Sequence, residues 1–264
     1  MTPRGVGPDR PHPDMGPDLG PDMSKARLAL AGGGPLVVLT GAGMSAESGV
    51  PTFRDAQTGL WARHDPAALA TPDAWDRDRD AVWAWYRWRE HLVGSAEPNA
   101  GHLAIARAAG ERRVTVVTQN VDDLHERAGT ADVHHLHGSL FAHRCDVCGT
   151  AIEVGPAPSE PVDRLAPPSC SRCGGRARPG VVWFGEMLPR QPWDAAVSAI
   201  STASAVLVVG TSGLVHPAAS LPGLAADRGV PLVEVNPGSP GFPHEASVHL
   251  RATAAQALPS LLAP

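Results

Sequence analysis

The chain has 264 residues, 43% hydrophobic and 19% charged, which suits a folded globular protein with a substantial core. Its formal net charge of -5 argues against a global basic field that would attract nucleic acid or an anionic membrane. No apolar run approaches the roughly 18 residues of a membrane-spanning helix, and the N-terminus lacks the pattern of a secretory signal. We therefore expect a soluble cytoplasmic protein with no membrane partner and no direct nucleic-acid partner.

Residues 1–23 are rich in Pro, Gly and Asp and have almost no apolar content. Such a segment buries too little apolar surface to offset the entropy lost on ordering. We predict a disordered tail there.

Short apolar runs then alternate with helical patterns. The run Leu36–Leu39 lies between glycines and is typical of a buried strand in a parallel sheet. Similar runs occupy 114–117, 205–209 and 230–235, and we expect helices at 76–93, 101–109 and 192–204. This alternation predicts an α/β fold with a Rossmann-like, doubly wound parallel sheet formed by residues 24–143 and 181–264. A helical insertion is expected at about 55–95.

The first strand runs into a glycine-rich segment. Gly41 and Gly43 would let the backbone approach a pyrophosphate, although a tight turn without a ligand also fits this short pattern. Ser45, Ser48 and Arg54 add hydroxyl and guanidinium donors, which favour a phosphate or ribose ligand.

Polar side chains follow the second predicted strand, at Gln119, Asn120 and Asp122. Ligands of doubly wound sheets bind where strands end, and a carboxylate with neighbouring backbone could hold a nicotinamide carboxamide. The same residues could instead cap the following helix. Three histidines come next, at 134, 135 and 137, and such a cluster could also suggest a metal site.

The cysteines offer a better metal site. Two Cys-x-x-Cys pairs are separated by residues 149–169, which is a strong zinc signal. The four predicted ligands are Cys145, Cys148, Cys170 and Cys173. Four thiolates leave no open position, so we predict one structural zinc ion in a small inserted module at 144–180.

Together these motifs resemble the sirtuin family from about Leu36 to Leu258. The resemblance rests on the segments 41–45, 48–54, 118–122, 137–138, 182–186 and 210–212, the cysteines and Asn236. It implies an NAD-binding domain, a small zinc domain and a cleft between them.

The resemblance also assigns residues. His137 would be the catalytic base, with Asn120 also catalytic, and Val182, Phe184 and Glu186 would line the acyl-peptide groove. The implied cofactor-binding residues are Gly41, Ala42, Gly43, Ser45, Phe53, Arg54, Trp61, Gln119, Asn120, Asp122, Gly210, Thr211, Ser212, Asn236 and Ala254. The implied reaction is NAD-dependent removal of acyl groups from protein lysines, releasing nicotinamide and O-acyl-ADP-ribose.

A narrower resemblance concerns the acyl group. Tyr86 and Arg89 form the Tyr-x-x-Arg of sirtuins that act on succinyl- and malonyl-lysine, and Ala70 would leave room for a longer acyl chain. On a helix, positions i and i+3 share one face. Without the other motifs, a surface arginine beside a packed aromatic in a tryptophan-rich helix would be the favoured explanation of this pair.

Three other functions compete with this interpretation. Plain lysine deacetylation would make Tyr86 and Arg89 incidental, and mono-ADP-ribosyl transfer would use the same NAD pocket. A zinc-ribbon adaptor for nucleic acid would need basic and aromatic residues around the cysteines, but acidic residues and prolines dilute the arginines there.

Overall fold

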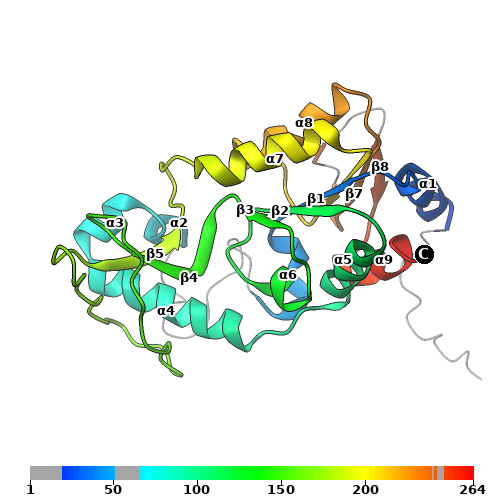
Figure 1. Cartoon of the computed structure of the whole chain (residues 1–264). Coiled ribbons are helices and arrows are strands. Elements are labelled where there is room, and N and C mark those ends of the chain that lie inside the picture. The colour runs from blue at the N-terminus through cyan, green and yellow to red at the C-terminus, as the bar shows by residue number, and fades with distance from the viewer. Residues whose placement is uncertain (1–19, 51–65, 240, 243–246) are drawn as a thin grey trace, which may run out of the picture.

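The computed structural model describes residues 20–50, 66–239, 241–242 and 247–264 (Figure 1). Its centre is a six-stranded sheet in the order β3-β2-β1-β6-β7-β8, and every neighbouring pair is parallel. The strands are β1 (Leu36–Thr40), β2 (Val114–Thr118), β3 (Val133–His135), β6 (Ala205–Val209), β7 (Leu232–Val235) and β8 (Ser247–Leu250). The predicted doubly wound parallel sheet is confirmed.

Helices cover both faces of the sheet (Figure 1). On one face lie α1 (Gly20–Leu30), α5 (Ala100–Glu111) and α9 (Ala254–Leu261), and on the other lie α7 (Arg190–Thr202) and α8 (Leu221–Ala226). Alternate residues of β1 point to opposite faces, so Val38 packs in the first core and Val37 in the second. Because α1 begins at Gly20, residues 20–23, which we expected in the tail, are helical.

The order of the strands creates a topological switch point. From β1 the chain winds outward through β2 and β3, and it later returns to the other side of β1 as β6. Loops that leave neighbouring strands in opposite directions open a crevice at the carboxyl ends of β1 and β6, where doubly wound sheets bind ligands. We call this side of the sheet the carboxyl edge.

A small lobe lies beside this sheet. It contains α3 (Pro72–Arg77), α4 (Arg79–Ser95), the antiparallel ribbon of β4 (Gly138–Cys145) and β5 (Ala177–Val181), and the loop 146–176. Its own core is mainly aromatic, with buried side chains including Trp75, Trp83, Trp85, Tyr86 and Trp183. The helical insertion therefore shares its core with the cysteine module and not with the sheet, and the ribbon that carries this module begins at Gly138, six residues before position 144.

The predicted helix at 76–93 is two helices. Asp78 separates them, with φ -153° and ψ 78°, and its side chain accepts a hydrogen bond from the Ala81 amide at 3.2 Å. An aspartate in this position caps the N-terminus of α4. The short helices α2 (Pro66–Leu69) and α6 (Leu124–Arg127) complete the helical elements that the site uses. Among the described residues, no helix combines the length and apolarity needed to cross a membrane.

Candidate active site and zinc centre

Two glycine loops meet at the carboxyl edge. Gly43 donates its amide to the Gly210 carbonyl at 2.8 Å, and Gly41 donates to Val209 at 3.0 Å. A Cβ atom on Gly43 would lie 2.7 Å from the Gly210 Cα, and Gly210 has a φ of +61°. Side chains are therefore excluded from this contact, which leaves backbone and small polar groups around the turn. The exposed Ala42 begins the first short 3-10 helix of this turn (Ala42–Met44).

A buried polar network joins the glycine loop after β1 to the loop after β2, residues 119–123. Ser45 donates its hydroxyl to an Asp122 carboxylate oxygen at 2.9 Å. The Asn120 amide nitrogen donates to the Gly41 carbonyl and to the Ser45 hydroxyl, both at 3.1 Å. Asp122 also accepts from the Leu124 amide at 3.2 Å, so it caps the following turn as well as serving the network. Burial raises the pKa of Asp122, and these two hydrogen bonds partly oppose that rise.

The loops after β6 and β7 extend the same edge. Gln119 donates its side-chain amide to the Thr211 hydroxyl at 3.0 Å, and Asn236 donates to the Thr211 carbonyl at 2.8 Å. Ser212 is half-buried beside them. Ala254 is buried at the start of α9, against Gly101 of α5.

Asn99 was not singled out in the sequence but supports this site. Its amide nitrogen donates to the Met44 carbonyl at 2.8 Å and to the Ser48 hydroxyl at 3.1 Å, while its oxygen caps α5. An asparagine directly before a helical pattern was the available signal. Its contacts with a loop some fifty residues away could not be read from the sequence.

His137 follows β3 and contacts the loop after β2. Its Nδ1 lies 2.9 Å from the Gln119 carbonyl oxygen. A carbonyl only accepts, so Nδ1 carries the proton and the neutral ring keeps a lone pair on Nε2. Burial lowers the pKa of His137, although the hydrogen bond to Gln119 opposes this. The ring is therefore mostly neutral at pH 7 and suited to accept a proton.

The segment after β5 links His137 to the small lobe. The Val182 amide donates to the His137 carbonyl at 2.8 Å, and the Phe184 amide donates to the Ala70 carbonyl at 2.9 Å. Between them, the Trp183 indole Nε1 donates to the Tyr86 hydroxyl oxygen at 3.0 Å. The segment 182–184 thus connects the predicted base to Tyr86, one of the predicted acyl-binding residues.

Tyr86 and Arg89 are both buried on α4, with 4% and 7% of their surfaces exposed. They interact electrostatically, and the Arg89 guanidinium carbon lies 5.1 Å from the centre of the Trp85 ring. Burial strongly raises the pKa of Tyr86, so its phenol stays protonated. A surface arginine beside a packed aromatic, the simpler explanation of this pair, does not fit a buried Arg89.

Glu186 has a structural role in this segment. Its carboxylate accepts from Arg178 at 2.8 and 2.9 Å and from the Trp183 amide at 2.9 Å. Although burial alone would raise the pKa of Glu186, Arg178 holds it below its usual value. Glu186 thereby fixes the turn that presents Trp183 and the half-exposed Phe184.

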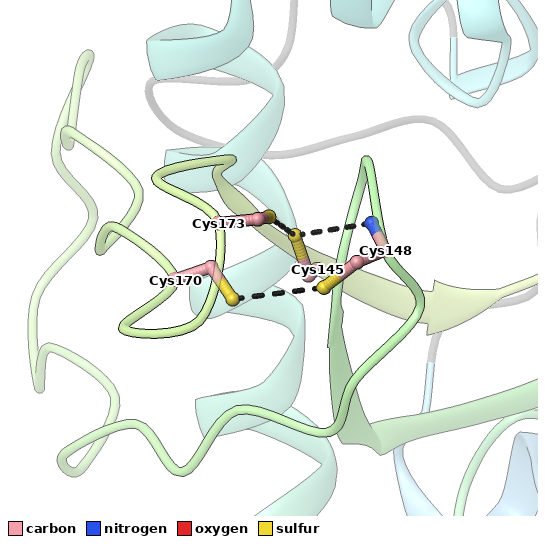
Figure 2. Close-up of side chains that lie close together, drawn as sticks. All are labelled: Cys145, Cys148, Cys170 and Cys173. Carbon is pink, nitrogen blue, oxygen red and sulfur yellow. Dashed lines mark hydrogen bonds between the residues drawn. The ribbon is translucent and has the colours of Figure 1, made fainter.

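The four cysteines converge at the tip of the small lobe (Figure 2). Their Sγ atoms all lie within 4.8 Å of one another, with 3.5 Å between Cys145 and Cys173 and 3.8 Å between Cys148 and Cys170. Zn–S bonds of about 2.3 Å in a tetrahedron place sulfur atoms about 3.8 Å apart. The four thiolate donors and their spacing fit a closed structural zinc site. The sulfur–sulfur distances are too long for disulfides.

The structure brings most of the predicted site residues close together. Three predicted cofactor residues, Phe53, Arg54 and Trp61, lie outside the described residues. The other predicted cofactor residues, apart from Ala254, lie at the carboxyl edge, and the residues predicted to bind the acyl group lie in the small lobe or in the segment that joins it to His137. The fold and site thus define a class: an α/β protein with a glycine-lined, polar nucleotide edge and a zinc-stabilised lobe.

Comparison with known proteins identifies the family. A profile of the Sir2 family matches residues 41–217. An NAD-dependent protein deacylase of Corynebacterium glutamicum is 55% identical over 85% of this chain and 89% of its own. An NAD-dependent protein deacylase of Mycobacterium tuberculosis is 53% identical over 86% of this chain and 96% of its own. The chain therefore belongs to the Sir2 family.

Solved structures agree. A crystal structure of a Sir2 homologue in complex with NAD superposes with a TM-score of 0.82 and 45% identity, covering 90% of this chain and 92% of the homologue. A Sir2 protein bound to an acetylated peptide gives a TM-score of 0.76 at 28% identity, covering 89% and 95%.

Proposed function

We propose that this NAD-dependent protein deacylase removes acidic acyl groups, succinyl and malonyl, from lysine side chains of proteins in preference to acetyl groups. The observation that carries the acyl preference is the buried pair Tyr86 and Arg89, one turn apart on α4, with Tyr86 connected to the His137 backbone through the segment 182–183.

The hydrogen bond from Trp183 determines how Tyr86 can act. An indole Nε1 is only a donor, so the Tyr86 oxygen accepts this bond and its own proton points elsewhere. Because the phenol is protonated, Tyr86 can donate to an acyl carboxylate. An acetyl group offers no such acceptor.

Arg89 supplies the charge. Burying a guanidinium is unfavourable, and this desolvation lowers the pKa of Arg89. A carboxylate that enters the same pocket loses its own hydration, and a bidentate contact with the guanidinium fork compensates both groups. The acidic acyl group and the buried arginine therefore stabilise each other.

The carboxyl edge would hold NAD. When bound, NAD supplies the electrophilic ribose carbon and the nicotinamide leaving group. Gly41 and Gly43 keep the backbone close to the ligand, and Asn120 with Asp122 presents buried amide and carboxylate groups. His137 accepts a proton at Nε2, because Gln119 fixes its Nδ1 in the protonated form.

The test is steady-state kinetics on matched acetyl, malonyl and succinyl peptides. Arg89→Met should lower kcat/KM for the two acidic peptides by about 10- to 150-fold, the effect of losing a charge-assisted contact, and spare the acetyl peptide. Arg89→Lys keeps the charge but loses the fork, so it should also be impaired on the acidic peptides.

Arg87 provides a matched control on the same helix. It is buried, but it pairs with Glu90 at 3.1 Å, so Arg87→Met removes an equal charge from the lobe without touching the predicted acyl pocket. Its effect should be equal on all three peptides. If Arg89→Met also lowers all three equally, Arg89 only supports the fold and plain deacetylation becomes the better proposal.

A further inference from the structure

His135 forms two hydrogen bonds from the end of β3. Its Nδ1 lies 3.0 Å from the Asn120 carbonyl oxygen, and its Nε2 lies 2.7 Å from a carboxylate oxygen of Glu126. His137, two residues later, holds the neighbouring Gln119 carbonyl in the same way. Two histidines of one segment thus hold two successive carbonyls of the loop that carries the polar network.

The two hydrogen-bond partners of His135 determine its protonation state. A carbonyl and a carboxylate both accept, so both ring nitrogens must donate and the ring is an imidazolium ion. His137, in contrast, has a single carbonyl partner and needs only one proton. The ion pair with Glu126 is about half-buried, since 18% of the His135 side chain and 42% of the Glu126 side chain are exposed.

We propose that His135 is a positioning residue for the NAD site: its imidazolium ion anchors the Asn120 carbonyl to Glu126 and so fixes the loop whose side chains bind NAD. The proposal rests on NAD binding at the carboxyl edge and not on the acyl preference, so it survives if the Arg89 test fails.

The fixed loop has a direct consequence for the network. The backbone of Asn120 is held by His135, while its side-chain amide donates to Gly41 and Ser45. If His135 no longer holds the Asn120 carbonyl, the backbone that carries the Asn120 side-chain amide is free to move. Asp122, two residues on, moves with it. Binding of NAD would then have to order this loop, which weakens affinity.

The charges around His135 favour its protonated form. Burial alone would lower the pKa of His135, but the hydrogen bonds to Glu126 and Asn120 and the charges of Glu126 and Asp122 raise it above the ordinary value. Asp123 also faces it, and buried His125, whose pKa falls to about 3, stays neutral. Arg127 on α6 pairs with Asp123 at 3.8 Å, and His134, Arg144 and Glu186 line the same open cavity as His135. Helix α7, which packs against β3, carries the exposed ion pair of Arg190 and Asp194.

Two variants separate the two hydrogen bonds. His135→Asn places an amide donor near the position of Nδ1 and keeps the bond to Asn120, whereas His135→Gln reaches Glu126 and loses that bond. Calorimetric titration with NAD at pH 6.5 should give a weaker affinity for both variants, because each keeps only one of the two bonds. The loss should be about tenfold for His135→Gln, which releases the carbonyl, and smaller for His135→Asn. The matched control is His134→Gln, because His134 pairs with Asp132 at 3.1 Å away from the loop and should leave affinity unchanged.

The pH dependence distinguishes positioning from a general structural role. The pKa of His135 is raised in the fold, so both hydrogen bonds are complete at low pH, and the bridge between Asn120 and Glu126 is broken as pH rises through that pKa, because a neutral ring keeps only one N–H donor. NAD affinity of the wild type should therefore weaken between pH 6.5 and pH 9, and that of His135→Asn should not. Superimposable pH profiles of these two proteins would overturn the proposal, as would equal NAD affinities for His135→Gln and His134→Gln.

A measurement on the wild-type protein remains decisive even if the variants fold poorly. Nitrogen-15 NMR of the histidine rings should show both nitrogens of His135 protonated at pH 6.5. A neutral His135 ring at that pH would contradict the anchoring geometry.

Discussion

The carboxyl edge of the sheet and the small lobe differ in the contacts that hold their functional side chains. At the carboxyl edge, Asn120, Asp122 and Thr211 are fixed by hydrogen bonds to loops that follow neighbouring strands. In the small lobe, Tyr86 and Arg89 are fixed mainly by aromatic packing around Trp183 and Trp85. The first region therefore depends on the topology of the sheet, and the second depends on an aromatic core and on the metal at its tip.

The chemistry and the acyl specificity therefore reside in different regions of the molecule. Loop backbones pinned by a rigid sheet suit groups that must hold a proton or a cofactor within a few tenths of an ångström. A pocket in the separate small lobe can accept a different acyl group without disturbing those loops. Changes to the lobe and to the edge should therefore have separable effects.

The largest effect should come from removing the metal. Cys170→Ser should abolish zinc binding and unfold the tip of the lobe, because folding and metal binding are coupled. Asp146, next to Cys145, accepts from the Trp75 indole at 3.3 Å, so the loss should spread to the aromatic core and abolish activity. Metal analysis and thermal unfolding check this, with exposed Ser171→Ala as the control. Retention of zinc and of full thermal stability would contradict the predicted ligand set.

The next effect tests the chemistry of the edge alone. His137→Ala should lower kcat by about 100- to 10,000-fold, the usual contribution of a general base, and leave NAD affinity nearly unchanged. His134→Ala, three positions earlier, should keep its rate. A His137→Ala enzyme with half the wild-type rate would remove His137 from the mechanism.

A smaller effect should follow from pH. The pKa of His137 lies below its ordinary value, and the unprotonated ring is the active form. The rate should therefore rise about tenfold per pH unit at low pH and level off before pH 6.5, near the ordinary pKa of histidine. A rise that continues to pH 8 would indicate a different base.

The smallest effect concerns the orientation of Tyr86. Trp183→Phe removes the donor to the Tyr86 hydroxyl and should lower kcat/KM for the succinyl peptide roughly tenfold or less, as expected for one neutral hydrogen bond. In a Tyr86→Phe background, the same substitution should cause little further loss. Additive losses in this double-mutant cycle would show that Trp183 acts by packing alone.

The central strands were predictable because they are buried on both faces. β6 is a continuous apolar run, β1 and β2 interrupt theirs only with threonine, and every residue of the three strands is buried. The edge strands β3 and β8 were not predicted, because β3 has only three half-buried residues, two of them histidines, and β8 alternates polar and apolar positions. The strand expected at 230–235 begins at Leu232, directly after Pro231.

The site residues that could be predicted from the sequence either directly follow a strand or have the sequence spacing of metal ligands. Gln119, Asn120 and the cysteines are of this kind. The partners of His135 and the Asn99 contacts with Met44 and Ser48 were not predictable, because they join segments distant in the sequence through tertiary packing. The role of Glu186 likewise needed the position of Arg178.

The division between edge and lobe is tested most directly by a competition assay with the wild-type protein. Acetyl, malonyl and succinyl versions of one peptide are mixed in equal amounts with NAD, and each deacylated product is followed by mass spectrometry. The succinyl and malonyl peptides should be consumed at least tenfold faster than the acetyl peptide. Equal rates, or faster consumption of the acetyl peptide, would contradict it.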